Sequence, residues 1–344
     1  MRNSFLTFIF PLVFATLAVT SCSDNKPVAG GSSDDSGIIA ISDKSVAGVS
    51  QKGPFVKGSS VTVQELEGET LKQTGKSFKG SINSGMGDFV INNISLVSQY
   101  AILEATGYFR NEVSGGMSAG MLTLRALTDL SERNTVNINL LTHIEYDRVM
   151  YLVGTGLSLQ EAKNQTETEI FRAFGIKDEF DNPEDLDIFR EGEGNAALLA
   201  ISIMMLRNLS EAEFTVFLNE FAADFETDGT WDDEDAKLDM AVWAQRGGYV
   251  TSTDLRGNIE AWNLGVVPDF EKYMRNFWYM VYGLDECGVE QEGMISALKN
   301  DSICDRNIVK QSGNFVLTIG ICDKDDRYVC QSGVWTRIPA SDEE

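Results

Sequence analysis

The sequence predicts a multidomain α and β protein: an antiparallel β-sandwich, then an all-α helical domain, then a small disulfide-stapled β tail. Short alternating apolar segments separated by glycines fill residues 46–130, which is typical of half-buried strands. Apolar residues recur at spacings of three and four in residues 131–285, which is typical of helices. Four of the five cysteines lie in residues 286–344. A chain of 344 residues is long enough for two or three such domains.

The first 45 residues are predicted to serve export and anchoring. Arg2 precedes an apolar run from Phe5 to Val19, which is the layout of a signal peptide over residues 1–21 and is too short to span a bilayer. The run ends in VTSC, which resembles the bacterial lipobox, whose cysteine becomes the acylated first residue of the mature protein; here it is Cys22. An ordinary secretory signal with an incidental cysteine is the alternative. Residues 22–45 are rich in Gly, Ser and Asp and are predicted to form a flexible tether.

Acylation at Cys22 would place the chain in the cell envelope, with the lipid bilayer as its first partner, because several acyl chains anchor a protein stably. Ser23 after that cysteine resembles the sorting signal for the outer membrane. The net charge of −24 predicts repulsion of nucleic acid. A solvated acidic surface explains this charge most simply, and attraction of divalent cations is the alternative.

Within residues 46–130, Val61, Val63 and Glu65 are expected on one face of a strand and Thr62 and Gln64 on the other. Further strands are predicted at residues 76–82, 88–91, 100–105 and 121–127. The stretches GPFVKGSSVTVQEL and GDFVI and the pair Tyr108-Phe109 resemble the carboxypeptidase regulatory-like, or transthyretin-like, β-sandwich. That resemblance implies a non-catalytic accessory domain.

Helix boundaries are marked by capping signals in residues 131–285. Two capping boxes, each a serine followed three residues later by a glutamate, predict helix starts at Ser158 and Ser210. Gly175 and Gly283 are predicted to end helices. The apolar segment from Ala196 to Leu209 predicts a buried central helix. After Pro268, aromatic residues at spacings of three and four predict a helix face that packs on the core.

The tail cysteines predict disulfide bonds, because an exported chain meets an oxidising compartment. Cys287, Cys304, Cys322 and Cys330 allow three connectivities, of which the sequential one, Cys287 with Cys304 and Cys322 with Cys330, closes the shortest loops. Zinc is disfavoured, since the chain lacks CxxC spacing and its single histidine, His143, lies far upstream. Near Cys330, Tyr328 and Trp335 would either stack on sugar rings or cover a disulfide as a miniature core, and the second interpretation is favoured.

Two further patterns could carry chemistry. Residues 224–235 align with an EF-hand loop, so calcium is a candidate ligand, although a helix-turn-helix with an aspartate cap explains the same letters. Its carboxylate ligands would be Asp224, Glu226, Asp228, Asp232 and Asp235. The segment from Gly116 to Gly120 matches the G-x-S-x-G elbow around Ser118, with Asp129 and His143 downstream. Its flanks favour a glycine-rich turn, because the elbow needs a buried strand before it and a helix after it.

The stretches TLRALTDLS, VNINLLTHIEYDR, EAKNQTETEIFRAFGI, FETDGTWDDEDAK and PDFEKYMRNFWYMVYGL and the C-x-SG-x-W tail are similar to a group of predicted lipoproteins of Fibrobacter-type bacteria. The resemblance implies a cell-envelope lipoprotein in organisms that adhere to plant fibre. We therefore expect a non-catalytic binding or structural protein without a cofactor. The alternatives are a polysaccharide-binding adhesin, a partner of other envelope proteins, and a hydrolase using Ser118.

Overall fold

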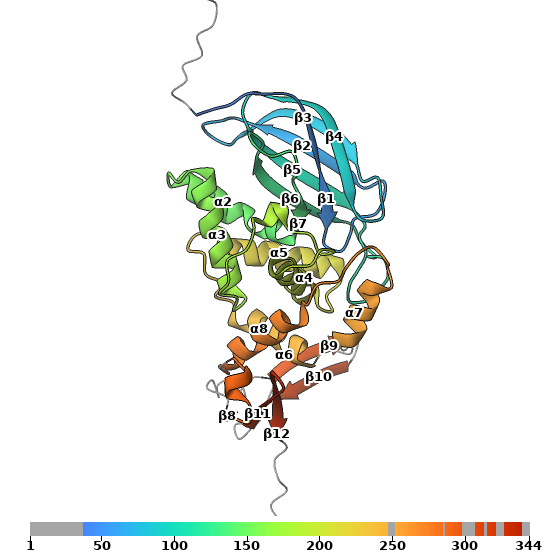
Figure 1. Cartoon of the computed structure of the whole chain (residues 1–344), viewed down its shortest axis with the longest axis vertical. Helices are drawn as coiled ribbons and strands as arrows, with labels where there is room; N and C mark the ends of the chain where they lie inside the picture. The colour runs from blue at the N-terminus through green and yellow to red at the C-terminus, as the bar shows by residue number, and fades with distance from the viewer. Residues whose placement is uncertain are drawn as a thin grey trace, which may run out of the picture. The chain divides into compact units, whose positions relative to one another are not determined.

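A computed structural model describes residues 37–246, 252–284, 286–297, 307–312, 315–320 and 327–338. Residues Ile38–Glu344 form one compact unit of mixed α/β structure. Within the described ranges this unit contains eight α-helices, several sheets and one disulfide bond (Figure 1). The predicted signal peptide and most of the predicted tether, including Cys22, lie outside the described residues.

A four-stranded antiparallel sheet has the order β3-β2-β5-β6. Its strands are β2 (Ser60–Leu66), β3 (Gln73–Ser81), β5 (Tyr100–Gly107) and β6 (Leu122–Asp129). The predicted alternation in β2 is confirmed, because Val61, Val63 and Glu65 are buried while Thr62 and Gln64 are half-buried. The sheet therefore turns one apolar face toward the core.

A second sheet has the order β4-β1-β7. It pairs β1 (Ile41–Gln51) antiparallel with β4 (Asp88–Leu96) and parallel with the short β7 (Ile138–Asn139). The predicted boundary of the tether at residue 45 is wrong. Residues 41–45 belong to β1, because Ile41 and Val46 are buried in the core although the residues between them are polar.

Two of the helices begin at the capping boxes that the sequence predicts, whereas the helix expected from Pro268 begins at Glu271. Ser158 and Ser210 each accept a hydrogen bond from the backbone amide of the glutamate three residues on, and both capping boxes are complete. Gly283 takes the left-handed conformation at the end of α8, as predicted. The helices are α1 (Leu140–Ile144), α2 (Tyr146–Gly154), α3 (Leu159–Ala173), α4 (Glu193–Leu206), α5 (Glu211–Phe225), α6 (Glu234–Arg246), α7 (Ser252–Glu260) and α8 (Glu271–Tyr282), with 3-10 turns η1 (Pro183–Asp185) and η2 (Val289–Gln291).

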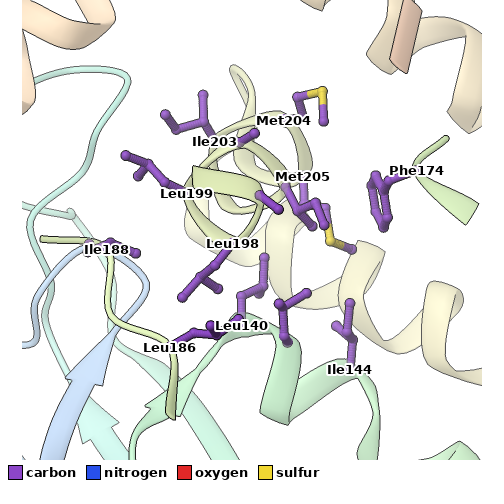
Figure 2. Close-up of a cluster of buried hydrophobic side chains, with 14 of the residues drawn as sticks. Leu140, Ile144, Phe174, Leu186, Ile188, Leu198, Leu199, Ile203, Met204 and Met205 are labelled. Atoms are coloured by element: carbon purple, nitrogen blue, oxygen red, sulfur yellow. The ribbon is translucent and has the colours of Figure 1, made fainter. Parts of the chain in front are cut away.

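The centre of the core is α4, whose residues from Ala196 to Leu206 are all buried. Figure 2 shows Leu198 and Leu199 on this helix, with Leu140 of α1 and Leu186 of the η1 segment beside them. The largest cluster of buried apolar residues includes both sheets, most of the helices and the tail, and a second, smaller cluster joins the four-stranded sheet to α2 and the start of α3. The predicted domain boundaries at 130 and 285 therefore coincide with changes of secondary structure inside one compact unit.

An aromatic cluster joins α3, α5 and α8. The ring centroid of Trp231 lies 5.3 Å from that of Phe221, 5.7 Å from Phe174 and 6.5 Å from Phe277. The aromatic residues at positions 270, 273, 277, 278 and 282 are buried, so the prediction that this stripe packs on the core is confirmed. Such ring pairs add to the stability gained by burial.

The tail contains a three-stranded sheet of order β12-β11-β8 and a separate β10-β9 pair. The bounds are β8 (Ile295–Ala297), β9 (Asn307–Ser312), β10 (Phe315–Gly320), β11 (Arg327–Gln331) and β12 (Val334–Ile338). Cys287 is bonded to Cys330, so the sequential pairing that closes the shortest loops is wrong. Cys330 in β11 is held beside the segment that follows α8 by hydrogen bonds with Gly293 and Met294. Cys304 and Cys322 lie outside the described residues.

Candidate functional site

The aromatic residues predicted near the tail cysteine are buried. Tyr328 is 2% exposed and Trp335 is 4% exposed, so neither offers a free face for a sugar ring. Trp335 pairs across the strands with Cys330, and Tyr328 lies 6.1 Å from the ring of Trp278 in α8. Their burial contradicts the weaker alternative, that they stack on sugar rings. Both rings belong to the main core cluster, so the favoured expectation of a separate miniature core over the Cys322–Cys330 bridge is wrong as well: Trp335 lies opposite Cys330, whose partner is Cys287.

The EF-hand-like loop between α5 and α6 uses its carboxylates locally. Asp224 accepts a hydrogen bond from the amide of Asp232 at 2.6 Å, and Asp228 accepts one from the amide of Thr230 at 2.9 Å. Asp233 caps α6 by accepting from the amide of Ala236. Among the described residues, no group of three or more His, Cys, Asp or Glu side chains could hold a metal ion. Calcium binding by Asp224, Glu226, Asp228, Asp232 and Asp235 stays a prediction.

Ser118 lies in a tight loop that pairs Arg110 with Met117. Its hydroxyl donates to the carbonyl of Gly120 at 2.8 Å and accepts from the amide of Phe109 at 3.0 Å. Both hydrogen-bonding capacities of the hydroxyl therefore serve the turn, as the flanking sequence indicates. Burial, together with the nearby Arg125, lowers the pKa of His143 to about 3, so its imidazole is neutral at pH 7.

A buried ion pair that the sequence did not reveal joins the sheets to α4. Both oxygens of Glu112 accept from the ammonium group of Lys52, at 2.8 and 2.9 Å, and both side chains are fully buried. Ser202 of α4 donates to the carbonyl of Lys52 at 2.9 Å and lies 3.2 Å from Glu112 Oε1. Burial lowers the pKa of Lys52, which the Glu112 carboxylate opposes. Because the group is enclosed, it acts in packing rather than on a ligand.

A second buried charge cluster lies beside α3. The ammonium group of Lys163 is 2.7 Å from Glu184 Oε2 and 3.1 Å from Glu145 Oε1. Burial alone would lower the pKa of Lys163, but the two carboxylates have the larger combined effect and raise this pKa. Burial raises the pKa of Glu145 to about 7, although Lys163 acts in the opposite direction. Two buried carboxylates thus share one ammonium group in a region with little water.

Two adjoining cavities lie on the outer side of that cluster. The first, of about 710 Å³, lies between the second half of α3 and residues 176–185. The second, of about 660 Å³, lies between the end of α3 and α8. Both are lined by Arg172, Ile176, Lys177 and Asp178, so they are neighbours. We call the two together the α3–α8 groove; α3 and α8 are labelled in Figure 1.

The groove combines acidic side chains with aromatic walls. Phe171 and Phe180 meet edge to face with ring centroids 4.9 Å apart, and Phe180 lies 6.2 Å from Tyr273 of α8. Glu167 lines the first cavity. Burial, followed by the charge of Glu145, raises the pKa of Glu167 to about 7. A cavity that holds convergent polar groups and a carboxyl with a perturbed pKa is a candidate binding site.

Periodicity in the sequence does not reveal this groove. Asn164, Thr168 and Arg172 are exposed and follow one another at a spacing of four, which reads as the solvent face of α3. The hollow forms only because residues 176–185 turn back along that face. The one local signal is the run KDEFDN after Gly175, which has too many acidic residues to continue the helix pattern.

No family model, curated protein or solved structure matches the chain. In the part of the chain that the structure describes, no helix is long and apolar enough to cross a membrane.

Proposed function

We propose that the chain is a bacterial cell-envelope lipoprotein, anchored in the outer membrane by acyl chains on Cys22. Residues 23–37 act as its tether, and the compact unit that begins at Ile38 acts as a non-catalytic binding protein. Its ligand site is the α3–α8 groove. The lipobox-like VTSC and the kinship with predicted Fibrobacter-type lipoproteins support the anchor.

The observation that carries the binding role is the pair of adjoining cavities with four lining residues in common. Each cavity has a volume within the range usual for ligand sites. The groove offers acceptors and donors without an arranged nucleophile and base among its lining residues, which supports binding rather than catalysis.

We also propose that the strands from β1 to β7 work as a β-sandwich of the transthyretin-like kind, in the role of an accessory domain. Buried residues of the two sheets, such as Val46, Ile91, Val63 and Leu103, belong to the same core cluster, which supports a face-to-face arrangement.

The anchor is tested by the mass of the mature amino terminus after expression of the full chain in a bacterium that processes lipoproteins. The expected result is a diacylglycerol-modified Cys22 as the first residue, in protein that sediments with membranes. Cys22→Ser should abolish both the modification and the sedimentation. A mature terminus elsewhere, or an unmodified thiol at Cys22, would contradict the anchor.

The site is tested by blocking the groove. Thr168→Trp places a bulky ring at an exposed lining position of α3, and Thr215→Trp does the same on α5 outside the groove. The two threonines are matched, because each is exposed and its hydroxyl donates a hydrogen bond to the backbone carbonyl four residues earlier. We expect Thr168→Trp alone to reduce retention of the purified mature chain on envelope fractions. Equal retention of the two variants would show that the ligand site does not lie in the groove.

A further inference from the structure

The α3–α8 groove is unbalanced in charge. Its lining contains the carboxyl groups of Glu167, Asp178, Glu179, Asp181, Asp185 and Glu286. Only two cationic side chains, Arg172 and Lys177, lie among these lining residues. Asp185 is already paired with Arg133 at 3.3 Å, but the other five carboxyl groups outnumber the two cations, so a ligand that brings positive charge is favoured there.

The shape of the groove favours an extended ligand. Each cavity alone would hold a compact molecule, but the two adjoin at Arg172, Ile176, Lys177 and Asp178, which line both. A ligand that fills both must run along the end of α3 toward α8. Chain molecules with repeated side groups meet this requirement, because successive groups can enter successive hollows.

The rim already binds one ammonium group in the expected manner. Lys272 of α8 lies with its Nζ 5.1 Å from the ring centroid of Tyr273, and it forms an ion pair with Glu193. Tyr273 lines the second cavity and contacts Phe180 of the first. Lys272 and the Tyr273 hydroxyl, which donates to Glu193 Oε2 at 2.7 Å, already occupy this carboxylate, so the arrangement illustrates cation binding next to the groove but is filled by the chain itself.

We propose that the α3–α8 groove binds an extended basic peptide segment, whose lysine or arginine side chains lie among its carboxylates. This inference rests on the proposed function and names its ligand class. The negative charge of the lining favours a basic segment of another envelope protein as the ligand. Neutral or acidic chains, including plant polysaccharides, lack the groups that would neutralise the lining.

Glu167 makes this binding depend on pH. Its neighbours are Glu145 from the turn between α1 and α2, Lys163 one turn earlier on α3, and Glu179 and Asp181 from the following loop. Burial and the acidic neighbours raise the pKa of Glu167 to about 7 while Lys163 opposes them. An incoming ammonium group favours the ionised carboxyl, so binding releases a proton. Affinity for the segment therefore rises with pH between about 6 and 8.

The test is a titration of the purified mature chain with fluorescent hexalysine, and with hexaglutamate and cellohexaose as probes of the rival classes. We expect hexalysine alone to bind and its affinity to fall as salt is added. Asp178→Lys reverses one lining charge, and Glu220→Lys makes the same change on an exposed site of α5. Asp178→Lys should weaken binding about tenfold and Glu220→Lys much less, provided that thermal melting shows both to be folded.

A second variant separates the outcomes. In Glu167→Gln, hexalysine affinity should lose its rise between about pH 6 and 8, whether or not Asp178→Lys folds. Absence of hexalysine binding, or equal weakening by Asp178→Lys and Glu220→Lys, would overturn the basic-peptide inference. Binding of cellohexaose that Thr168→Trp blocks would overturn it as well but would leave the binding role of the groove intact. Failure of Thr168→Trp to affect any ligand would overturn the proposed site itself.

Discussion

Lys52 and Glu112 show how one buried ion pair can determine the contact between two parts of a chain. Removing both charges from water is costly, and only close, well-directed hydrogen bonds repay it. Here two bonds of 2.8 and 2.9 Å and the hydroxyl of Ser202 do so. The rings of Phe109 and Phe214, with centroids 5.9 and 5.6 Å from the ammonium nitrogen, complete the enclosure.

Breaking this pair from one side should be costly. Lys52→Met or Glu112→Leu leaves the partner charge buried alone, and each should lower the free energy of unfolding by about 3–5 kcal/mol. The double variant Lys52→Met/Glu112→Leu should lose much less, because no uncompensated charge remains. Urea denaturation of the three variants measures the coupling. Additive losses in the double variant would show that the two side chains do not act as a pair.

Glu167 predicts a pH effect on stability with a definite sign. Its ordinary pKa of 4.5 applies to the unfolded chain, and its pKa in the folded chain is about 7. Between these values the folded state holds a proton that the unfolded state has released, so the free energy of unfolding falls as pH rises from about 4.5 to about 7. Urea denaturation across this range should show a shallower fall in Glu167→Gln than in the natural chain. Glu220→Gln is the control, and identical slopes in all three would refute the assignment.

At the scale of elements, the loop between α5 and α6 is attached to α2 and α3 by one arginine. Arg148 is bidentate to Glu169, at 2.8 and 2.9 Å, and donates to the carbonyls of Glu226 and Thr227. Gly229 follows with φ of +72° and stands against the Glu169 carboxylate. The glycine at the sixth position of the EF-hand-like pattern is therefore required by this contact.

Gly229→Ala should test that contact. A Cβ at this position would lie 2.2 Å from Glu169, whereas a Cβ on Gly156, with φ of +109°, would meet open space. Both alanine variants incur strain of about 1 kcal/mol from a positive φ. Gly229→Ala should lose more, because the Arg148–Glu169 pair must also shift. Thermal melting of the two variants gives the comparison, and equal losses would mean that the carboxylate moves aside freely.

Most elements could be predicted from signals between neighbouring residues. Features that depend on contacts between distant segments could not. Capping boxes at Ser158 and Ser210 are encoded within four residues, so they are read directly. The pairing of Cys287 with Cys330 depends on which segment β11 meets, and loop length alone favours other partners. The groove likewise depends on how a loop returns to its own helix. The strand that begins at Ile41 could not be predicted, because four consecutive polar residues follow Ile41 and its pairing with β4 is irregular there.

For the whole molecule, the disulfide connects the end of the helical part to the last sheet. Its two cysteines are 43 residues apart, and the loop that it closes includes β8, β9 and β10. Tyr328 and Trp335 on the two last strands extend the central core cluster into the tail. The main core cluster thus continues from the first strand to the tail, with a second, smaller cluster between the four-stranded sheet and α2, which single segments of sequence could not indicate.

Removing the disulfide should destabilise this unit. Chain entropy for a loop of 43 residues gives about 4 kcal/mol as an upper figure for Cys287→Ala/Cys330→Ala. Because the tail shares the core, unfolding should stay a single transition when followed by far-ultraviolet circular dichroism and by tryptophan fluorescence. Two separate transitions, or a loss below about 1 kcal/mol, would show that the tail contributes little to the unit.

The central claim is that the α3–α8 groove is the ligand site, and hydrogen–deuterium exchange with and without hexalysine tests it most directly. We predict slower exchange in residues 164–185 and 272–284 when hexalysine is bound, and unchanged exchange in β2 and β5. Protection confined to the sheets or the tail, with residues 164–185 unaffected, would contradict the account.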